Sequence, residues 1–298
     1  MIVAAVDLGT NTTRLLVGRV DGERVEEVHR ETRITRLGEG VDSRRRLLPV
    51  PIARVRNVLS DYRRTAESLG AERTLLVATS AVRDAENGEA FLGEIEWSYG
   101  FATQLLSGEE EAELTVRGVG GLEAGTLLVD IGGGSTELVL DDFDASLAMG
   151  SVRFSERYGD DPAASTAAAR DLLPGLEPQD AVGVAATITS LAALDLGLER
   201  YDRERVHGHV LTRDGARGQL ERLAAMRLDE RRRVPALEPE RAPVIVAGAA
   251  ILVAILDAYG LEAIRVSERD LLDGAALAAA ELPEPEEGAA PPGAYTCC

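Results

Sequence analysis

The sequence contains almost no cysteine. Its two cysteines, Cys297 and Cys298, are the last of 298 residues, so the rest of the chain has none. This excludes a disulfide framework and a thiolate metal site in the body of the protein, and it is typical of a reducing cytosol. A terminal Cys-Cys pair can also be a lipidation signal, but no other feature points to a membrane, and we interpret the pair as part of a tail.

The chain also lacks a hydrophobic run that could cross a membrane. The longest run, residues 244–256, has 13 residues, whereas a spanning helix needs about 20. This run predicts a buried core helix instead. Residues 2–6 resemble a strand directly after Met1, without the basic segment that opens a secretory signal. We therefore expect a cytoplasmic protein with no membrane partner.

Lysine is absent, and all 32 basic residues are arginine. The formal net charge of −19 argues against a nucleic-acid partner. Residues 1–60 nevertheless carry 11 Arg against 8 Asp and Glu. Because arginine makes forked contacts with phosphate oxygens, Arg-rich segments are candidate phosphate paths. The alternative is that codon bias explains the missing lysine, and that the triplets at 44–46 and 231–233 are solvated surface.

The remaining pattern alternates strands with helices, and its length suits two domains. Apolar residues recur on one face of each predicted helix, and turn signals separate the strands. From residue 126 the opening theme of strand, turn, strand and strand is repeated. We predict strands at 2–7, 13–20, 24–31, 73–79 and 101–106, helices at 52–69, 88–98 and 109–119, and further strands at 127–131, 137–140, 145–148, 181–186 and 263–266.

Two segments of the chain match each other. Residues 7–17 and 130–140, which begin 123 residues apart, share the pattern Asp-(Leu/Ile)-Gly-x-x-(Ser/Thr)-Thr-x-Leu. Such a repeat indicates an internal duplication with a site between the copies. In each copy an Asp ends a strand, and a turn of small residues allows backbone N–H groups to approach an anion together.

The two matched turns therefore predict phosphate-binding loops. Carboxylates at the edges of these loops are well placed to hold a hard cation that bridges to phosphate oxygens. One such turn alone would more often be structural, because Gly-rich turns between strands occur in many folds. The predicted phosphate-binding residues are Thr10, Asn11, Thr12, Gly132, Gly133, Gly134, Ser135 and Thr136, and the predicted metal ligands are Asp7, Asp130 and Glu137.

Four longer motifs give the chain a resemblance to a known family. Residues 106–112 contain Ser-Gly-x-Glu-Glu-Ala, which resembles the catalytic-helix signature of the exopolyphosphatase and guanosine-pentaphosphate phosphohydrolase family. This family lies in the superfamily of actin, sugar kinases and heat-shock chaperones. Residues 5–12 and 129–138 resemble its two phosphate loops, residues 78–87 resemble a segment beside its cleft, and residues 150–153 and 266–268 are weaker echoes.

The resemblance implies a mixed α/β fold of two duplicated ribonuclease-H-like (actin-like) lobes with a cleft between them. Residues 1–122 would form the first lobe and residues 123–268 the second, and a helix at about 270–281 would pack back on the first lobe. Residues 282–298 are rich in proline and acidic side chains, which predicts a disordered tail.

The resemblance also implies the chemistry of the site. Glu111 would orient and deprotonate the water that attacks the terminal phosphorus, Arg83 would bind the phosphate chain, and Mg²⁺ or Mn²⁺ would be the cofactor. The two glutamates before Glu111 have the alternative role of complementing the helix dipole. For Arg83 the alternative is a surface ion pair with Asp84 or Glu86.

Two departures from the family pattern bear on the substrate. Residues 185–187 are Ala-Ala-Thr where the family has Gly before Thr, and alanine would weaken a third anion or nucleotide contact if the backbone there needs a positive φ. Residues 267–274 lack one Gly and one Arg of the pattern, and the chain stops without the extra helical domains of long members. We therefore expect a preference for shorter polyphosphate chains.

The predicted function is exopolyphosphatase action, the processive or stepwise hydrolysis of the terminal phosphate of inorganic polyphosphate. The alternative activity is removal of the 5′-γ-phosphate of guanosine pentaphosphate, which would link the protein to guanosine tetraphosphate and the stringent response. A non-catalytic polyphosphate or alarmone-binding protein is a third hypothesis, against which Glu111, Asp130 and Glu137 argue. Dimers are common in the family, so a homodimer is the expected assembly, although no interface is visible in the sequence.

Overall fold

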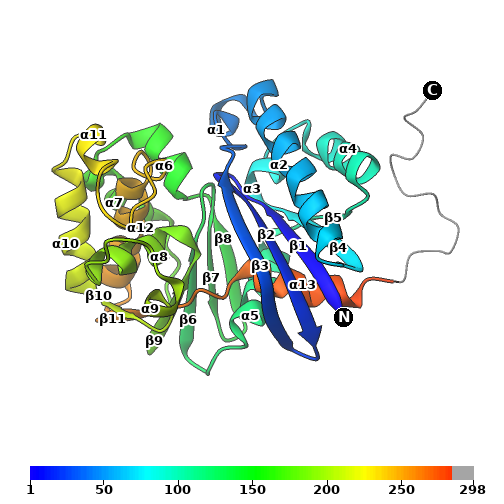
Figure 1. Ribbon diagram of the computed structural model, residues 1–298. Helices are drawn as coiled ribbons and strands as arrows, with labels where there is room; N and C mark the ends of the chain where they lie inside the picture. The colour runs from blue at the N-terminus through cyan, green and yellow to red at the C-terminus, as the bar shows by residue number, and fades with distance from the viewer. Residues whose placement is uncertain (284–298) are drawn as a thin grey trace, which may run out of the picture. The chain divides into compact units, whose positions relative to one another are not determined.

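The computed structural model describes residues 1–283 (Figure 1). The chain divides into two compact units. The first comprises residues 1–120 together with the chain from residue 271, and the second comprises residues 121–270. Most of the predicted tail at 282–298, including Cys297 and Cys298, lies outside the described residues. Within residues 1–283, no helix is long and apolar enough to cross a membrane.

The first unit is built on a five-stranded sheet in the order β3-β2-β1-β4-β5. β1 pairs antiparallel with β2 and parallel with β4, so a hairpin and a crossover connection meet at this strand. The strands are β1 (Ile2–Leu8), β2 (Thr12–Asp21), β3 (Arg24–Ile34), β4 (Arg73–Ala78) and β5 (Ala102–Leu105). The helices are α1 (Val41–Arg44), α2 (Pro49–Ser68), α3 (Ser80–Arg83), α4 (Gly88–Tyr99), α5 (Gly108–Val119) and α13 (Leu271–Glu281).

The central strand of this sheet is buried on both faces. Ala4 and Val6 of β1 belong to an apolar core that includes side chains of α2 and α4. Val3 and Ala5 belong to a second core, to which α13, near the C-terminal end of the chain, contributes apolar side chains. Successive side chains of a strand point to opposite faces, so one short apolar run serves both cores. Burial on both faces explains why residues 2–6 form an unbroken apolar segment in the sequence.

Gly274 allows a close approach between two helices of the first unit. α13 packs against α5, and a Cβ atom added to Gly274 would lie 1.9 Å from the carbonyl oxygen of Leu114. Because that neighbour is backbone, we expect Gly274→Ala to lower the free energy of unfolding by about 1–3 kcal/mol, measured by chemical denaturation. In the control Gly93→Ala, no described atom lies within 4 Å of the added Cβ, and alanine should stabilise α4 by about 0.5–1 kcal/mol. Equal stability of the two variants would contradict this assignment.

The second unit contains a six-stranded sheet in the order β10-β11-β9-β6-β7-β8. Its strands are β6 (Thr126–Ile131), β7 (Thr136–Leu140), β8 (Phe143–Leu147), β9 (Asp180–Val184), β10 (Val210–Thr212) and β11 (Ala263–Val266). Its helices are α6 (Ser151–Tyr158), α7 (Pro162–Leu172), α8 (Ala185–Asp195), α9 (Arg203–Val206), α10 (Arg213–Ala224), α11 (Leu228–Arg231) and α12 (Ile245–Ala258).

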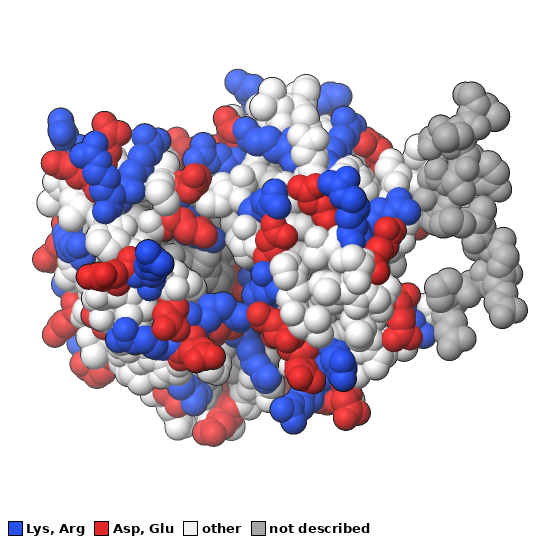
Figure 2. All heavy atoms as spheres, viewed as in Figure 1, with Lys and Arg blue, Asp and Glu red and all other residues white. Residues whose placement is uncertain are grey.

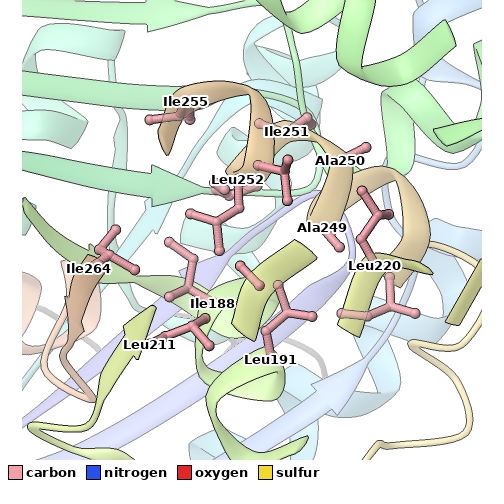
Figure 3. Close-up of a cluster of buried hydrophobic side chains, with 14 of the residues drawn as sticks. Ile188, Leu191, Leu211, Leu220, Ala249, Ala250, Ile251, Leu252, Ile255 and Ile264 are labelled. Carbon is pink, nitrogen blue, oxygen red and sulfur yellow. The ribbon is translucent and has the colours of Figure 1, made fainter. Parts of the chain in front are cut away.

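The core of the second unit is organised around α12. Every residue of this helix from Ile245 to Leu256 is buried, which confirms the predicted core helix. Figure 3 shows Leu252 of α12 next to Ile188 of α8, within a cluster that also includes Leu211 of β10 and Ile264 of β11. A helix that is apolar all round needs neighbours on every side, and α6, α7, α8, α10 and β6 provide them.

The two sheets repeat one topology. When the second is followed from β8, its first five strands run β8-β7-β6-β9-β11 and match β3-β2-β1-β4-β5 of the first. In both, the first three strands are an antiparallel meander and the next strand is parallel to the central one. The predicted α/β fold with two duplicated ribonuclease-H-like lobes is confirmed. β10 was not predicted, and the strand predicted at 181–186 ends at Val184, because Ala185 already begins α8.

The second arginine triplet is only partly on the surface. The prediction of solvated surface was wrong for Arg231, which has no exposed area. Its guanidinium donates to the carbonyl oxygens of Leu223, Met226 and Ala242 and to the carboxylate of Asp160. Because all of these partners are protein groups, Arg231 ties together loops of the second unit and is not available to a phosphate.

Candidate active site

The first predicted phosphate loop is the turn between β1 and β2. The N–H of Gly9 donates to the carbonyl oxygen of Thr12 over 3.0 Å and closes the turn. Thr10 and Asn11 lie at its tip and are almost completely buried. The hydroxyl of Thr10 is 3.1 Å from that of Ser80, a residue that the sequence analysis did not single out. Ser80 belongs to the 78–87 motif, so the signal was present, although no role was assigned to it.

The second predicted loop, between β6 and β7, closes in the same way. The N–H of Gly132 donates to the carbonyl oxygen of Ser135, again over 3.0 Å. The equal closing bonds of the two turns are structural support for the duplication. Like the residues at the tip of the first loop, Ser135 and Thr136 are buried.

The start of α6 fixes the direction of the peptide groups in the second loop. The carbonyl oxygen of Gly132 accepts from the N–H of Ser151 (3.0 Å), and that of Gly133 accepts from the N–H of Val152 (2.8 Å). The carbonyl oxygen of Gly134 accepts from Nε of Arg153 (2.6 Å). In a trans peptide the next N–H points the opposite way. The amides of residues 133–135 therefore point away from α6, and none of them makes a hydrogen bond within the described chain. Successive amides without a hydrogen-bond partner are the kind of donors that anion-binding nests use.

Gly150 permits this contact between loop and helix. A Cβ atom added to it would lie 2.5 Å from the carbonyl carbon and oxygen of Gly133. Together with Arg153, which is buried, Gly150 supports the loop from behind. Both residues lie in the 150–153 segment, which the sequence analysis noted only as a weak echo. Their role depends on contacts with residues at least 17 positions earlier in the chain, so the local sequence could not predict it.

Two carboxylates face each other beside the second loop. Asp130 at the end of β6 is directly opposite Glu137 of β7, and both are buried. Directly opposed residues of neighbouring strands share one face of the sheet. Ser146 of β8 donates its hydroxyl proton to Oε1 of Glu137 over 2.8 Å. Oxygen ligands of this kind suit Mg²⁺ or Mn²⁺, and Mg²⁺ commonly takes one or two carboxylates together with substrate phosphates. The donor set therefore fits a divalent cation.

The matching position of the first unit has a different chemistry. Asp7 is opposite Arg14 in the β1–β2 pairing, and Nε of Arg14 donates to Oδ2 of Asp7 over 2.7 Å. The duplication has thus left an acid pair in one unit and an ion pair in the other. Among residues 1–283, no group of three or more His, Cys, Asp and Glu side chains gathers as a metal centre. Oδ2 of Asp7 is therefore already bound by a cationic side chain of the protein.

The predicted catalytic residue lies at the start of α5 in the first unit. Ser107 caps this helix: its hydroxyl accepts from the N–H of Glu110, and the Glu110 carboxylate accepts from the N–H of Ser107 over 2.7 Å. The pKa of Glu110 is lowered, mainly by that backbone hydrogen bond. Glu110 is therefore a capping residue. Glu111, the next residue, is turned inward and is only 6% exposed.

Arg83 and Glu111, both predicted site residues, are brought together. Nη1 of Arg83 lies 3.2 Å from Oε2 of Glu111 and donates to the carbonyl oxygen of Leu106 over 2.6 Å. The alternative of an ion pair with Asp84 or Glu86 does not describe this arginine, because its partners come from the start of α5. This contact fixes the position of the Glu111 carboxylate and keeps the Arg83 guanidinium beside it.

Ala185, and not Ala186 directly before Thr187, has the positive φ considered for this segment. It follows β9 at the start of α8 with φ of 65°, a region that glycine adopts easily and alanine does not. We expect Ala185→Gly to raise the free energy of unfolding by about 1 kcal/mol, measured by thermal or chemical denaturation. Ala186→Gly is the matched control, since Ala186 has an ordinary φ within the helix and glycine there should destabilise by up to about 1 kcal/mol. The same sign for both variants would refute this explanation.

The chain is similar to known proteins over most of its length. Residues 16–281 match the model of the Ppx/GppA phosphatase family. Exopolyphosphatase 2 of Mycobacterium tuberculosis is 38% identical, over 93% of this chain and 98% of that protein. A guanosine-5′-triphosphate,3′-diphosphate pyrophosphatase of Vibrio vulnificus is 31% identical over 92% of this chain but 58% of its own length. Among solved structures, the Aquifex aeolicus Ppx/GppA family member superposes with a TM-score of 0.77 at 28% identity, over 94% of this chain and 97% of the other.

Proposed function

The chain belongs to the Ppx/GppA phosphatase family, and from this premise we propose that it is an exopolyphosphatase. The reaction is hydrolysis of the terminal phosphoric anhydride bond of inorganic polyphosphate, with water as the nucleophile. The near full-length similarity to a protein named exopolyphosphatase supports this substrate over guanosine pentaphosphate. We also propose that the protein acts in the cytoplasm, and a homodimer remains the expected assembly.

Glu111 is the proposed general base. Its carboxylate would accept a hydrogen bond from the attacking water, orient it in line with the leaving chain and take up its proton. Arg83 supports this role because its guanidinium fixes one carboxylate oxygen at 3.2 Å. As phosphoryl transfer asks little covalent work of the protein, positioning and charge neutralisation account for most of the expected rate enhancement.

The two loops are the proposed phosphate-binding elements. In the second, the amides of residues 133–135 offer three donors with a common direction. In the first, Thr10, Asn11 and Thr12 would supply hydroxyl, amide and backbone donors. A divalent cation, Mg²⁺ or Mn²⁺, held by Asp130 and Glu137 would neutralise phosphate oxygens.

The observation that carries the proposal is the inward carboxylate of Glu111, buried directly after a capping residue and held by an arginine. A protein that only bound phosphate chains would gain nothing from burying an acid that repels them. The free-energy cost of burying this carboxylate is explained if the carboxylate takes part in catalysis.

The test is phosphate release by the purified protein with Mg²⁺ or Mn²⁺, on polyphosphate and guanosine pentaphosphate in parallel. The expected result is phosphate release with a higher kcat/KM for polyphosphate than for guanosine pentaphosphate. Release from the nucleotide alone would establish the alternative activity, to which the Vibrio vulnificus relative points. Absence of release from both, with polyphosphate still bound, would leave a binding protein and refute the enzymatic proposal.

A further inference from the structure

We propose that the arginine triplet at residues 44–46 is a subsite for the phosphates that lie behind the one being hydrolysed. This inference rests on the proposed function and assigns the remainder of the substrate to a surface of the first unit. The triplet ends α1 and continues into the following turn. Its three side chains are exposed.

The segment before the triplet is fastened to the first phosphate loop. The N–H of Arg36 donates to the carbonyl oxygen of Asn11 over 2.9 Å, and the N–H of Gly38 donates to that of Thr10 over 2.8 Å. A Cβ atom added to Gly38 would lie 2.2 Å from Cγ2 of Thr10, so the two strands of backbone touch. These contacts hold the segment that leads to the triplet beside the first phosphate loop.

The segment after the triplet is fastened to the motif that carries Arg83. The N–H of Glu86 donates to the carbonyl oxygen of Arg45 over 2.8 Å. The side chain of Asn87 exchanges two hydrogen bonds with the backbone of Leu47, at 2.8 and 3.1 Å. The triplet is thus held between the first phosphate loop and the segment whose Arg83 contacts Glu111.

The arginines of the triplet have unused donors. The side chains of Arg44 and Arg46 make no hydrogen bond or ion pair with any described residue, and Arg45 reaches Asp84 only at 4.0 Å. Figure 2 shows arginine side chains gathered over α1 and the adjoining end of α2. Acidic side chains do lie nearby, at Asp42, Asp84 and Glu86, but residues 36–46 carry four Arg against two acidic residues and so have an excess of positive charge. Arg231 of the other triplet, by contrast, is occupied by carbonyl oxygens.

Backbone conformation adds a second argument. Arg36 and Arg45 have φ of 50° and 54°, in the left-handed region that favours glycine. Each costs about 1 kcal/mol relative to glycine or a relaxed backbone. Side chains held in such conformations tend to occur where a function requires them. Guanidinium groups are suited to phosphate, which they bind by paired, charge-assisted hydrogen bonds.

The test compares two double variants in the Glu111→Gln background, so that binding is measured without turnover. Arg44→Gln/Arg46→Gln should weaken the Kd for long-chain polyphosphate by about tenfold and that for tripolyphosphate by less than about twofold. Raising the ionic strength should narrow the difference, because exposed charges are screened. The control is Arg19→Gln/Arg24→Gln, which removes two exposed, unpaired arginines at the far end of the β2–β3 hairpin, about 20 Å along the strand from Thr12.

The possible outcomes separate this inference from the proposed function. Equal affinities of the two double variants for long chains would overturn the subsite, as would a Glu111→Gln parent that binds tripolyphosphate as tightly as long polyphosphate. Neither result would touch the assignment of catalysis, which is judged by phosphate release from the protein with Glu111 intact. Thermal denaturation of both double variants should match the parent, because all four arginines are exposed.

Discussion

Glu111→Gln is expected to lower the rate of phosphate release from polyphosphate by about 10²–10⁴-fold. Glutamine keeps the size of the side chain and can still accept a hydrogen bond from Arg83, but it cannot take the proton of the attacking water. The loss should therefore appear in kcat, while the Kd for polyphosphate changes by only a few-fold. Steady-state phosphate release and equilibrium binding on the same preparations would measure both quantities.

Glu110→Gln is the matched control for this experiment. Glu110 caps α5 and points away from the buried site, so its removal should leave kcat within a few-fold of the wild type. Its pKa is lowered in the folded protein, mainly by the backbone hydrogen bond from Ser107. The ionised side chain therefore stabilises the fold above its unfolded pKa, and this contribution is lost as the pH falls through the folded pKa. The wild type should be more stable than Glu110→Gln at neutral pH, and this difference in stability should disappear in acid. Comparable losses of kcat in both variants would contradict the choice of Glu111.

Glu137→Gln is expected to lower phosphate release on the order of 100-fold and to weaken Mn²⁺ binding. Glu137 and Asp130 are opposed on neighbouring strands, and removing one carboxylate halves the negative charge offered to a cation. Mn²⁺ binding followed by electron paramagnetic resonance gives a readout that does not depend on turnover. Part of the lost activity should return at high Mn²⁺ concentration, because the remaining carboxylate still binds.

Asp142→Asn is the control for Glu137→Gln. Asp142 is exposed in the turn between β7 and β8, so the substitution removes one negative charge from the same hairpin without touching the opposed pair. It should leave both Mn²⁺ binding and kcat near wild type. Unchanged Mn²⁺ affinity in Glu137→Gln would remove Glu137 from the proposed metal ligands.

Much of the fold could be predicted because its signals are local. Strands β1 and β6 are short apolar runs ended by Asp, and each is followed by a turn of small residues and a second strand. Residues 244–256 are apolar without interruption, and the helix at that place is buried on every side. The motifs that support the family resemblance are likewise continuous stretches of sequence. Such features depend on side-chain period and turn chemistry over a few residues.

Predictions failed where the answer depended on distant contacts. β10 has three residues and exists because it pairs with β11, about 50 residues further along the chain. The end of β9 was misplaced because Ala185 adopts a conformation that its residue type disfavours. Arg83 had an acidic neighbour in sequence at Asp84, yet its partner is Glu111, which α5 brings to it.

The sequence by itself determined the duplication, the two matched turns and the family, since each depends on residue types at fixed spacing. Only the tertiary structure decided what each charged residue does. The triplets at 44–46 and 231–233 are identical in sequence, yet Arg231 is enclosed by carbonyl oxygens and Arg44 lies in solvent. Asp7 and Asp130 end equivalent strands, yet one meets an arginine and the other a glutamate. The role of a charge depends on its burial and on its partner, and long-range packing sets both.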